Sequence, residues 1–102
     1  MTAVVRVTES QKHGRIVAWF CPACRYCHSV QTAGSPRWDW NGDCVRPTVS
    51  PSVLHYINDD DGQRKTICHY FIRDGRIEYC SDSPHGLAGQ SVDLLPVEEW
   101  PE

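Results

Sequence analysis

Cys21 and Cys24 are separated by two residues, and they directly follow a β-like segment, Arg15 to Phe20. This spacing lets both sulfurs reach one tetrahedral ion, as in a zinc knuckle. The chain holds six cysteines and five histidines in 102 residues, and its N-terminus lacks the charged-then-apolar layout of a signal peptide. Thiols in a reducing compartment bind metal or stay free more often than they pair. We therefore expect Zn²⁺ in a cytoplasmic protein, with free thiols, disulfides or a redox pair as alternatives.

Short β-branched segments separated by glycine and proline predict a mainly β, small α+β fold. The clearest element is a hairpin formed by residues 66–73 and 76–80, because Asp74-Gly75 is a strong two-residue turn signal. A cap at Ser83 followed by Pro84 predicts one short helix near 84–89. The chain length suits one domain. We expect residues 1–102 to form a single zinc-ribbon-like antiparallel β domain.

The predicted hairpin limits which residues complete the metal site. Cys68 and His69 are strand neighbours, so they point to opposite faces and should not bind the same ion. The same register places His69 directly opposite Cys80, close enough to share a ligand. Four protein ligands would close the site and make it structural. The predicted ligands are Cys21, Cys24, Cys68 and His85, and the alternatives for the second pair are His28, His69 and Cys80.

A distinctive series of motifs extends the pattern beyond the cysteines. The motifs are Cys21-Pro-Ala-Cys24 with His28, Trp38-Asp-Trp-Asn-Gly-Asp43, Arg46-Pro-Thr-Val-Ser-Pro-Ser52, Cys68-His-x-Phe71 and Asp82-x-x-His85-x-Leu-Ala-Gly-Gln90. Together they resemble a family of small, functionally uncharacterised proteins of bacteriophages and prophages. Its members are sometimes labelled ammonia monooxygenases, a label that no residue here supports. The resemblance implies a phage or bacterial cytoplasmic setting and a zinc-ribbon-like domain. Family members usually carry cysteine two residues before the last histidine, where this chain has Ser83. If that cysteine is a zinc ligand in the family, Cys80 is the obvious substitute here; if it is not, the predicted ligand set is unchanged.

Composition and spacing favour a binding module over an enzyme. Trp38 and Trp40 belong to a set of large aromatic residues that a small core cannot bury completely, so they are candidates for either core or interface. In a phage setting, the expected partner is a host protein, such as a defence component. No zinc-hydrolase signature such as HExxH is present, so enzymatic activity is uncertain and not favoured. An enzyme would draw its acid, base or nucleophile from Asp43, Asp82, His28, His69 and His85.

Charge and hydropathy exclude other classes. The net charge of −3 argues against a general nucleic-acid-binding protein, and a nucleic-acid-binding zinc module is therefore the weakest alternative. No apolar run is long enough to span a membrane. The oligomeric state does not follow from the sequence.

Overall fold

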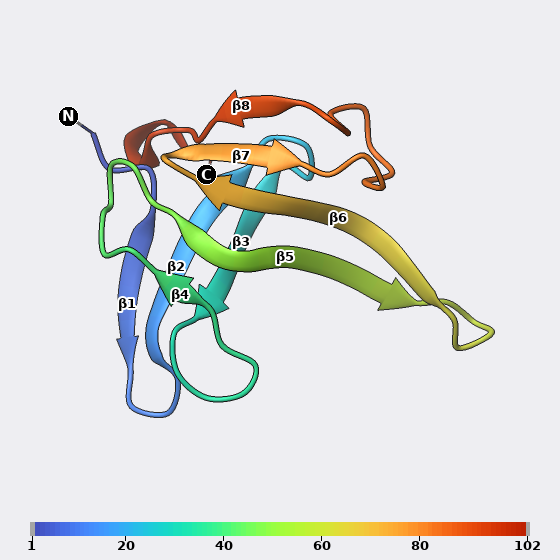
Figure 1. The fold of residues 1–102 in the computed structure, drawn as a ribbon, viewed down its shortest axis with the longest axis horizontal. Helices are drawn as coiled ribbons and strands as arrows, with labels where there is room; N and C mark the ends of the chain where they lie inside the picture. Colours follow the sequence, from blue (N-terminus) through green and yellow to red (C-terminus); the bar gives the residue numbers. More distant parts are fainter. Residues whose placement is uncertain (1, 102) are drawn as a thin grey trace.

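The strands of this protein form two antiparallel sheets, as the computed structural model of residues 2–101 shows (Figure 1). The first sheet has the order β1-β2-β3, with β1 at Arg6–Ser10, β2 at Gly14–Cys21 and β3 at Tyr26–Gln31. The second has the order β4-β5-β6-β7-β8, with β4 at Asp39–Trp40, β5 at Val49–Asn58, β6 at Arg64–Arg73, β7 at Arg76–Tyr79 and β8 at Ser91–Asp93. The predicted mainly β fold is confirmed.

The predicted hairpin forms between β6 and β7. Asp74 and Gly75 both have positive φ angles, 50° and 78°, as the tight turn requires. A side chain at Gly75 would also approach the Val45 carbonyl oxygen to 3.1 Å. Opposite residues pair as Tyr70 with Tyr79 and Ile72 with Ile77, which confirms the predicted register.

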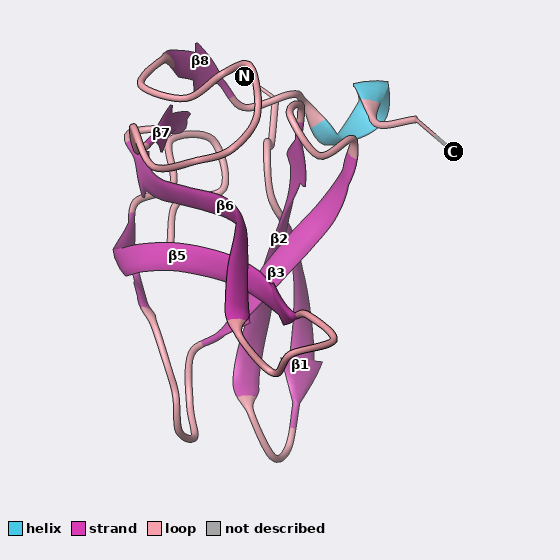
Figure 2. Ribbon diagram, turned by 90° about the vertical axis from the view of Figure 1, so that its right-hand side faces the viewer, coloured by secondary structure: helices cyan, strands magenta, loops and turns pink. Residues whose placement is uncertain are grey.

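The core lies where the two sheets face each other, and Figure 2 shows β5 and β6 crossing the strands of the first sheet. Fully buried side chains alternate along two of its strands: Val17, Trp19 and Cys21 on β2, and Cys68, Tyr70 and Ile72 on β6. Burial of each large apolar side chain contributes about 1.5–3 kcal/mol. A polar bond across this core joins its two largest fully buried members, since Trp19 donates its indole N–H to the Tyr70 hydroxyl at 2.9 Å. No helix among residues 2–101 is long and apolar enough to cross a membrane.

The helix expected near 84–89 does not form. This segment makes two turns, in which Ala88 N–H bonds the His85 carbonyl and Gln90 N–H bonds the Leu87 carbonyl. Glycine disfavours helix, and the His85 ring competes with the backbone by accepting the Leu87 N–H. The only helix among the described residues is the 3₁₀ turn η1, Val97–Glu99.

Trp38 precedes the short strand β4 and Trp40 ends it, and both are partly buried against the core. Their indole N–H groups bond backbone carbonyls, of Ser52 for Trp38 and of Asp43 for Trp40, both at 3.2 Å. These contacts favour a packing role for the two rings over an interface role.

Strand β5 contains an irregularity that positions one side chain of the site. Val49 pairs with Ile72 and Val53 with Tyr70, so residues 50–52 on β5 oppose only Phe71 on β6. Pro51 has no N–H group to donate within this bulge. Bulges redirect side chains, and they occur frequently next to active sites. The bulge ends at Ser52.

His55 lies between the sheets, with its ring stacked on His28 at a centroid distance of 3.8 Å and its Nε2 at 2.9 Å from the Tyr70 hydroxyl. Burial and the neighbouring His28 lower the pKa of His55 to about 4. The folded chain therefore binds a proton at His55 less readily than the unfolded chain, whose histidine pKa is about 6.5. The stability from neutral His55 is complete above that value and is lost as the pH falls through about 4.

We expect the free energy of unfolding to fall less steeply from neutral pH to about pH 4 in His55→Gln than in the wild type. Glutamine retains a hydrogen-bonding group for Tyr70 but does not titrate. Urea unfolding at several pH values measures the two slopes. Because every other titrating group is common to both proteins, identical slopes would contradict this role of His55.

Candidate active site and metal centre

The turn between β2 and β3 presents two thiols from one short segment. Cys21 ends β2, and the chain reverses through Arg25, whose φ of 62° allows its N–H to bond the Cys21 carbonyl at 2.7 Å. The Cys24 N–H points to the Cys21 sulfur at 3.4 Å. Amide groups directed at a sulfur stabilise its thiolate form, as in the zinc knuckle that the sequence predicts.

Two further residues complete a compact group of ligand atoms. Cys68 on β6 and His28 on β3 join Cys21 and Cys24, and the four ligand atoms all lie within 4.8 Å of one another. His28 is buried, and its Nε2 has no hydrogen-bond partner among residues 2–101. Buried polar nitrogens are rarely left unpaired. Three thiols and one imidazole are a ligand set typical of Zn²⁺, so these residues fit a metal ion.

The protonation of the three thiols is strongly interdependent. Hydrogen bonding with Cys68 and Tyr79, together with the neighbouring His28 ring, lowers the pKa of Cys21 to about 3 against the opposing effect of burial. Burial and the charge on Cys21 raise the pKa of Cys24 to about 11. The hydrogen bond with Cys21, together with burial, raises the pKa of Cys68. Ionisation of Cys21 thus disfavours ionisation of the other two thiols. A bound cation would remove this repulsion, because it stabilises all three thiolates at once.

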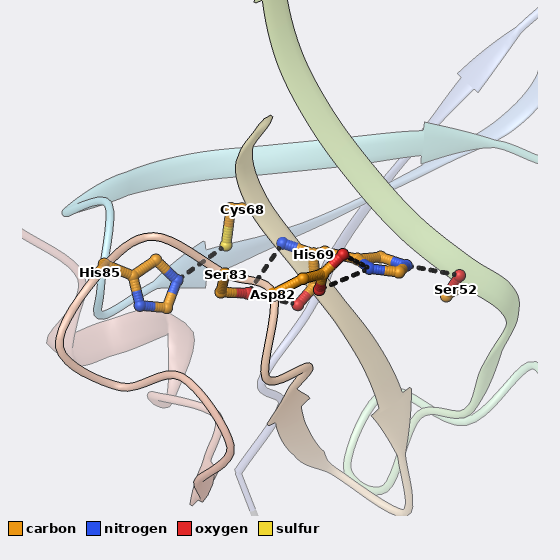
Figure 3. Close-up of polar contacts among 6 residues, drawn as sticks. All are labelled: Ser52, Cys68, His69, Asp82, Ser83 and His85. Atoms are coloured by element: carbon orange, nitrogen blue, oxygen red, sulfur yellow. Dashed lines mark hydrogen bonds and ion pairs between the residues drawn. The ribbon is translucent and has the colours of Figure 1, made fainter. Parts of the chain in front are cut away.

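His85 contacts one member of this group, Cys68, as Figure 3 shows. Its Nε2 lies 3.2 Å from the Cys68 sulfur, while its Nδ1 accepts the Leu87 N–H at 3.2 Å. An imidazole that accepts at Nδ1 carries its proton on Nε2 when neutral, so Nε2 is placed to donate to the Cys68 sulfur. The structure thus brings Cys21, Cys24 and Cys68 together with His28, and it places His85 against Cys68.

The opposite face of β6 carries a second group. The ring of His69 lies between two oxygen-bearing side chains, with Nε2 at 3.1 Å from the Ser52 hydroxyl and Nδ1 at 3.0 Å from Asp82 (Figure 3). Ser52 comes from the bulge of β5 and Asp82 from the loop after β7. The His69 and Asp82 side chains are 25% and 61% exposed, so this group is accessible from solvent. A hydroxyl, an imidazole and a carboxylate in this order form the nucleophile–base–orienter arrangement of serine hydrolases.

Ser83 fixes the loop that carries Asp82. Its hydroxyl is buried, donates to the His69 carbonyl at 2.7 Å and accepts the His69 N–H at 3.1 Å. The residue next to Asp82 is therefore tied twice to the backbone of the histidine that Asp82 orients. The family resemblance raised the question of whether Ser83 replaces a zinc ligand. In this chain the Ser83 hydroxyl instead forms hydrogen bonds that position the loop.

The sequence indicated His69 and Asp82 as candidate acid or base residues, but it did not indicate Ser52. No local signature such as GxSxG surrounds Ser52, and its partners lie on other elements. The three cysteines outside the thiol group are Cys27, which is exposed, Cys44, which packs against the core, and Cys80, which lies near His69.

A family model described as "Bacterial ubiquitination-like system serine protease (BubE)" matches residues 2–80. This chain belongs to the BubE family. Ser52 and His69 lie inside the matched region, and Asp82 follows two residues after its end. No curated protein and no solved structure matches the chain. The phage setting inferred from the sequence motifs stays a prediction.

We expect one metal ion per chain in protein purified under reducing conditions without added zinc. Cys24→Ser and His28→Ala should lose the ion, because each removes a ligand. His85→Ala should retain it with about 10- to 100-fold lower affinity, the usual effect of losing a group that orients a ligand. Native mass spectrometry counts the bound ions, and a chelator titration measures their affinity. If His85→Ala lost the ion and His28→Ala kept it, the ligands would be Cys21, Cys24, Cys68 and His85.

Proposed function

We propose that this BubE-family protein is a serine protease of a bacterial ubiquitination-like system, with Ser52 as nucleophile, His69 as general base and Asp82 as the group that orients His69. The observation that carries the proposal is the continuous hydrogen-bonded series from the Ser52 hydroxyl through both His69 nitrogens to Asp82, at 3.1 and 3.0 Å. The family description supports the same reaction class.

Each of these three residues has a defined role in the proposed reaction. Ser52 Oγ attacks the carbonyl carbon of the scissile amide while His69 Nε2 takes the hydroxyl proton. Asp82 accepts the Nδ1–H of His69, which keeps Nε2 free to act as base and stabilises the charged ring. His69 then gives its proton to the leaving amine, and an acyl ester remains on Ser52. A water molecule, deprotonated by His69, hydrolyses this ester and restores the serine.

The metal centre acts at a distance from this chemistry. The thiols and the triad lie on opposite faces of β6, because Cys68 and His69 are consecutive residues of one strand. We therefore assign the ion, Zn²⁺ by its ligand chemistry, a structural role in joining the β2–β3 turn to β6. The alternative of a zinc-dependent hydrolase that uses His or Asp beside the metal is less well supported by this arrangement.

Polypeptide is the substrate class that the surface favours. Beyond Ser52, the same strand exposes three large apolar side chains, Leu54, Tyr56 and Ile57, which are 37%, 47% and 50% exposed. Exposed aromatic and aliphatic side chains serve as anchors at protein interfaces. The sequence predicted a host protein as partner. We propose more specifically that the partner is a protein substrate in the bacterial cytoplasm.

A fluorophosphonate probe tests the nucleophile without knowledge of the natural substrate. We expect wild-type protein to be labelled on Ser52, Ser52→Ala and His69→Gln to lose labelling, and Asp82→Asn to label at least about a hundredfold more slowly, because an asparagine favours the wrong tautomer of His69. Mass spectrometry of the labelled peptide identifies the site.

Ser50→Ala is the matched control, because Ser50 lies in the same bulge, whereas the hydrogen bond to His69 Nε2 comes from Ser52. It should label at the wild-type rate. Thermal melting checks that every variant is folded. A folded Ser52→Ala protein that is still labelled, or a wild type that is never labelled, would overturn the proposed function.

A further inference from the structure

Cys80 lies beside the triad without taking part in the proposed reaction. It follows β7 directly, and its N–H bonds the His69 carbonyl at 2.9 Å, so the two residues are cross-strand neighbours. One ligand atom each from His69, Cys80 and Asp82 lie within 4.8 Å of one another. These three residues form a group separate from the thiol centre, on the other face of β6.

We infer that His69, Cys80 and Asp82 form an inhibitory site for Zn²⁺, in which the ion binds in place of the proton shared by His69 and Asp82. The inference rests on the proposed function. A nitrogen, a thiolate sulfur and a carboxylate oxygen are all common zinc ligands, and three protein ligands leave one position open to solvent. Asp82 is 61% exposed, so an ion can enter without unfolding the core.

The chemical consequence follows from which nitrogen faces the ion. Nδ1 is the nitrogen next to Asp82, at 3.0 Å, whereas Nε2 faces Ser52. When Zn²⁺ binds Nδ1, the neutral ring carries its single proton on Nε2. Nε2 can then donate to the Ser52 hydroxyl but cannot accept its proton, so the general base is lost. The Cys80 thiol proton passes to solvent on binding, and removal of the ion restores the triad.

The structural zinc and the inhibitory zinc differ in access and in ligand number. The thiol centre has four ligand atoms in the core, two of them from fully buried cysteines, Cys21 and Cys68. The second group has three ligands at the surface. Free zinc should therefore saturate the thiol centre first and the triad only at higher concentration.

Metal counting tests the site independently of catalysis. With excess zinc, native mass spectrometry should show two ions on the wild type and one on Cys80→Ser, whereas Cys27→Ser should keep two. Cys27 is the matched control because it is an exposed cysteine outside both groups. Cys80→Ala serves as a second variant if Cys80→Ser melts at a lower temperature. One ion on the wild type at every zinc concentration would overturn the inference.

Inhibition is read from the fluorophosphonate labelling rate in zinc-buffered solutions. We expect zinc to abolish labelling of the wild type and of Cys27→Ser, and Cys80→Ser to require at least tenfold more free zinc. Labelling without added zinc should be equal in all three. Equal zinc sensitivity of wild type and Cys80→Ser would overturn the inference while leaving the protease proposal intact. A wild type that binds two ions but is never labelled would instead overturn the proposed function.

Discussion

The alternation of side chains along β6 is the constraint on which the rest of the molecule depends. Consecutive residues of a strand point to opposite faces, so Cys68 is directed into the thiol centre and His69 to the solvent-accessible face. The backbone of one strand therefore carries both a proposed metal ligand, Cys68, and the proposed general base, His69. A shift of register by one residue would exchange the two faces, and neither group would form.

This register is held by contacts on both sides of β6. On the buried side, Tyr70 accepts a hydrogen bond from Trp19, and the Cys21 sulfur lies 3.2 Å from the Tyr79 hydroxyl on the neighbouring strand. A domain of this size has a narrow margin of stability, because its chain buries a modest fraction of its surface. A metal ion bound at the thiol centre would add a cross-link between the β2–β3 turn and β6. In the proposed function this centre would fix the position of His69 without taking part in the chemistry.

The sequence predicted the features that depend on local chemistry. The Asp74-Gly75 turn fixed the β6–β7 register, and the register placed Cys68 and His69 on opposite faces and His69 opposite Cys80. Ser52 was not predictable in the same way, because it reaches His69 only through the three-residue bulge of β5 and the packing of β5 on β6. The prediction of a helix near 84–89 was wrong, because a capping serine is a weak signal for a helix in this segment. The Ser83 hydroxyl bonds the backbone of His69 on another strand instead of starting a helix.

The triad is unusual in placing its carboxylate at the surface, and this position has a physical consequence. In the serine-protease template the acid is buried, and burial holds it in place. Here Asp82 is exposed, so burial cannot fix its orientation. The double hydrogen bond of Ser83 to the His69 backbone provides that restraint, because it makes the loop carrying Asp82 move with the strand carrying His69. An accessible triad held by backbone contacts would suit a polypeptide substrate, which must approach on an open face, and the same openness would let the proposed inhibitory cation reach His69.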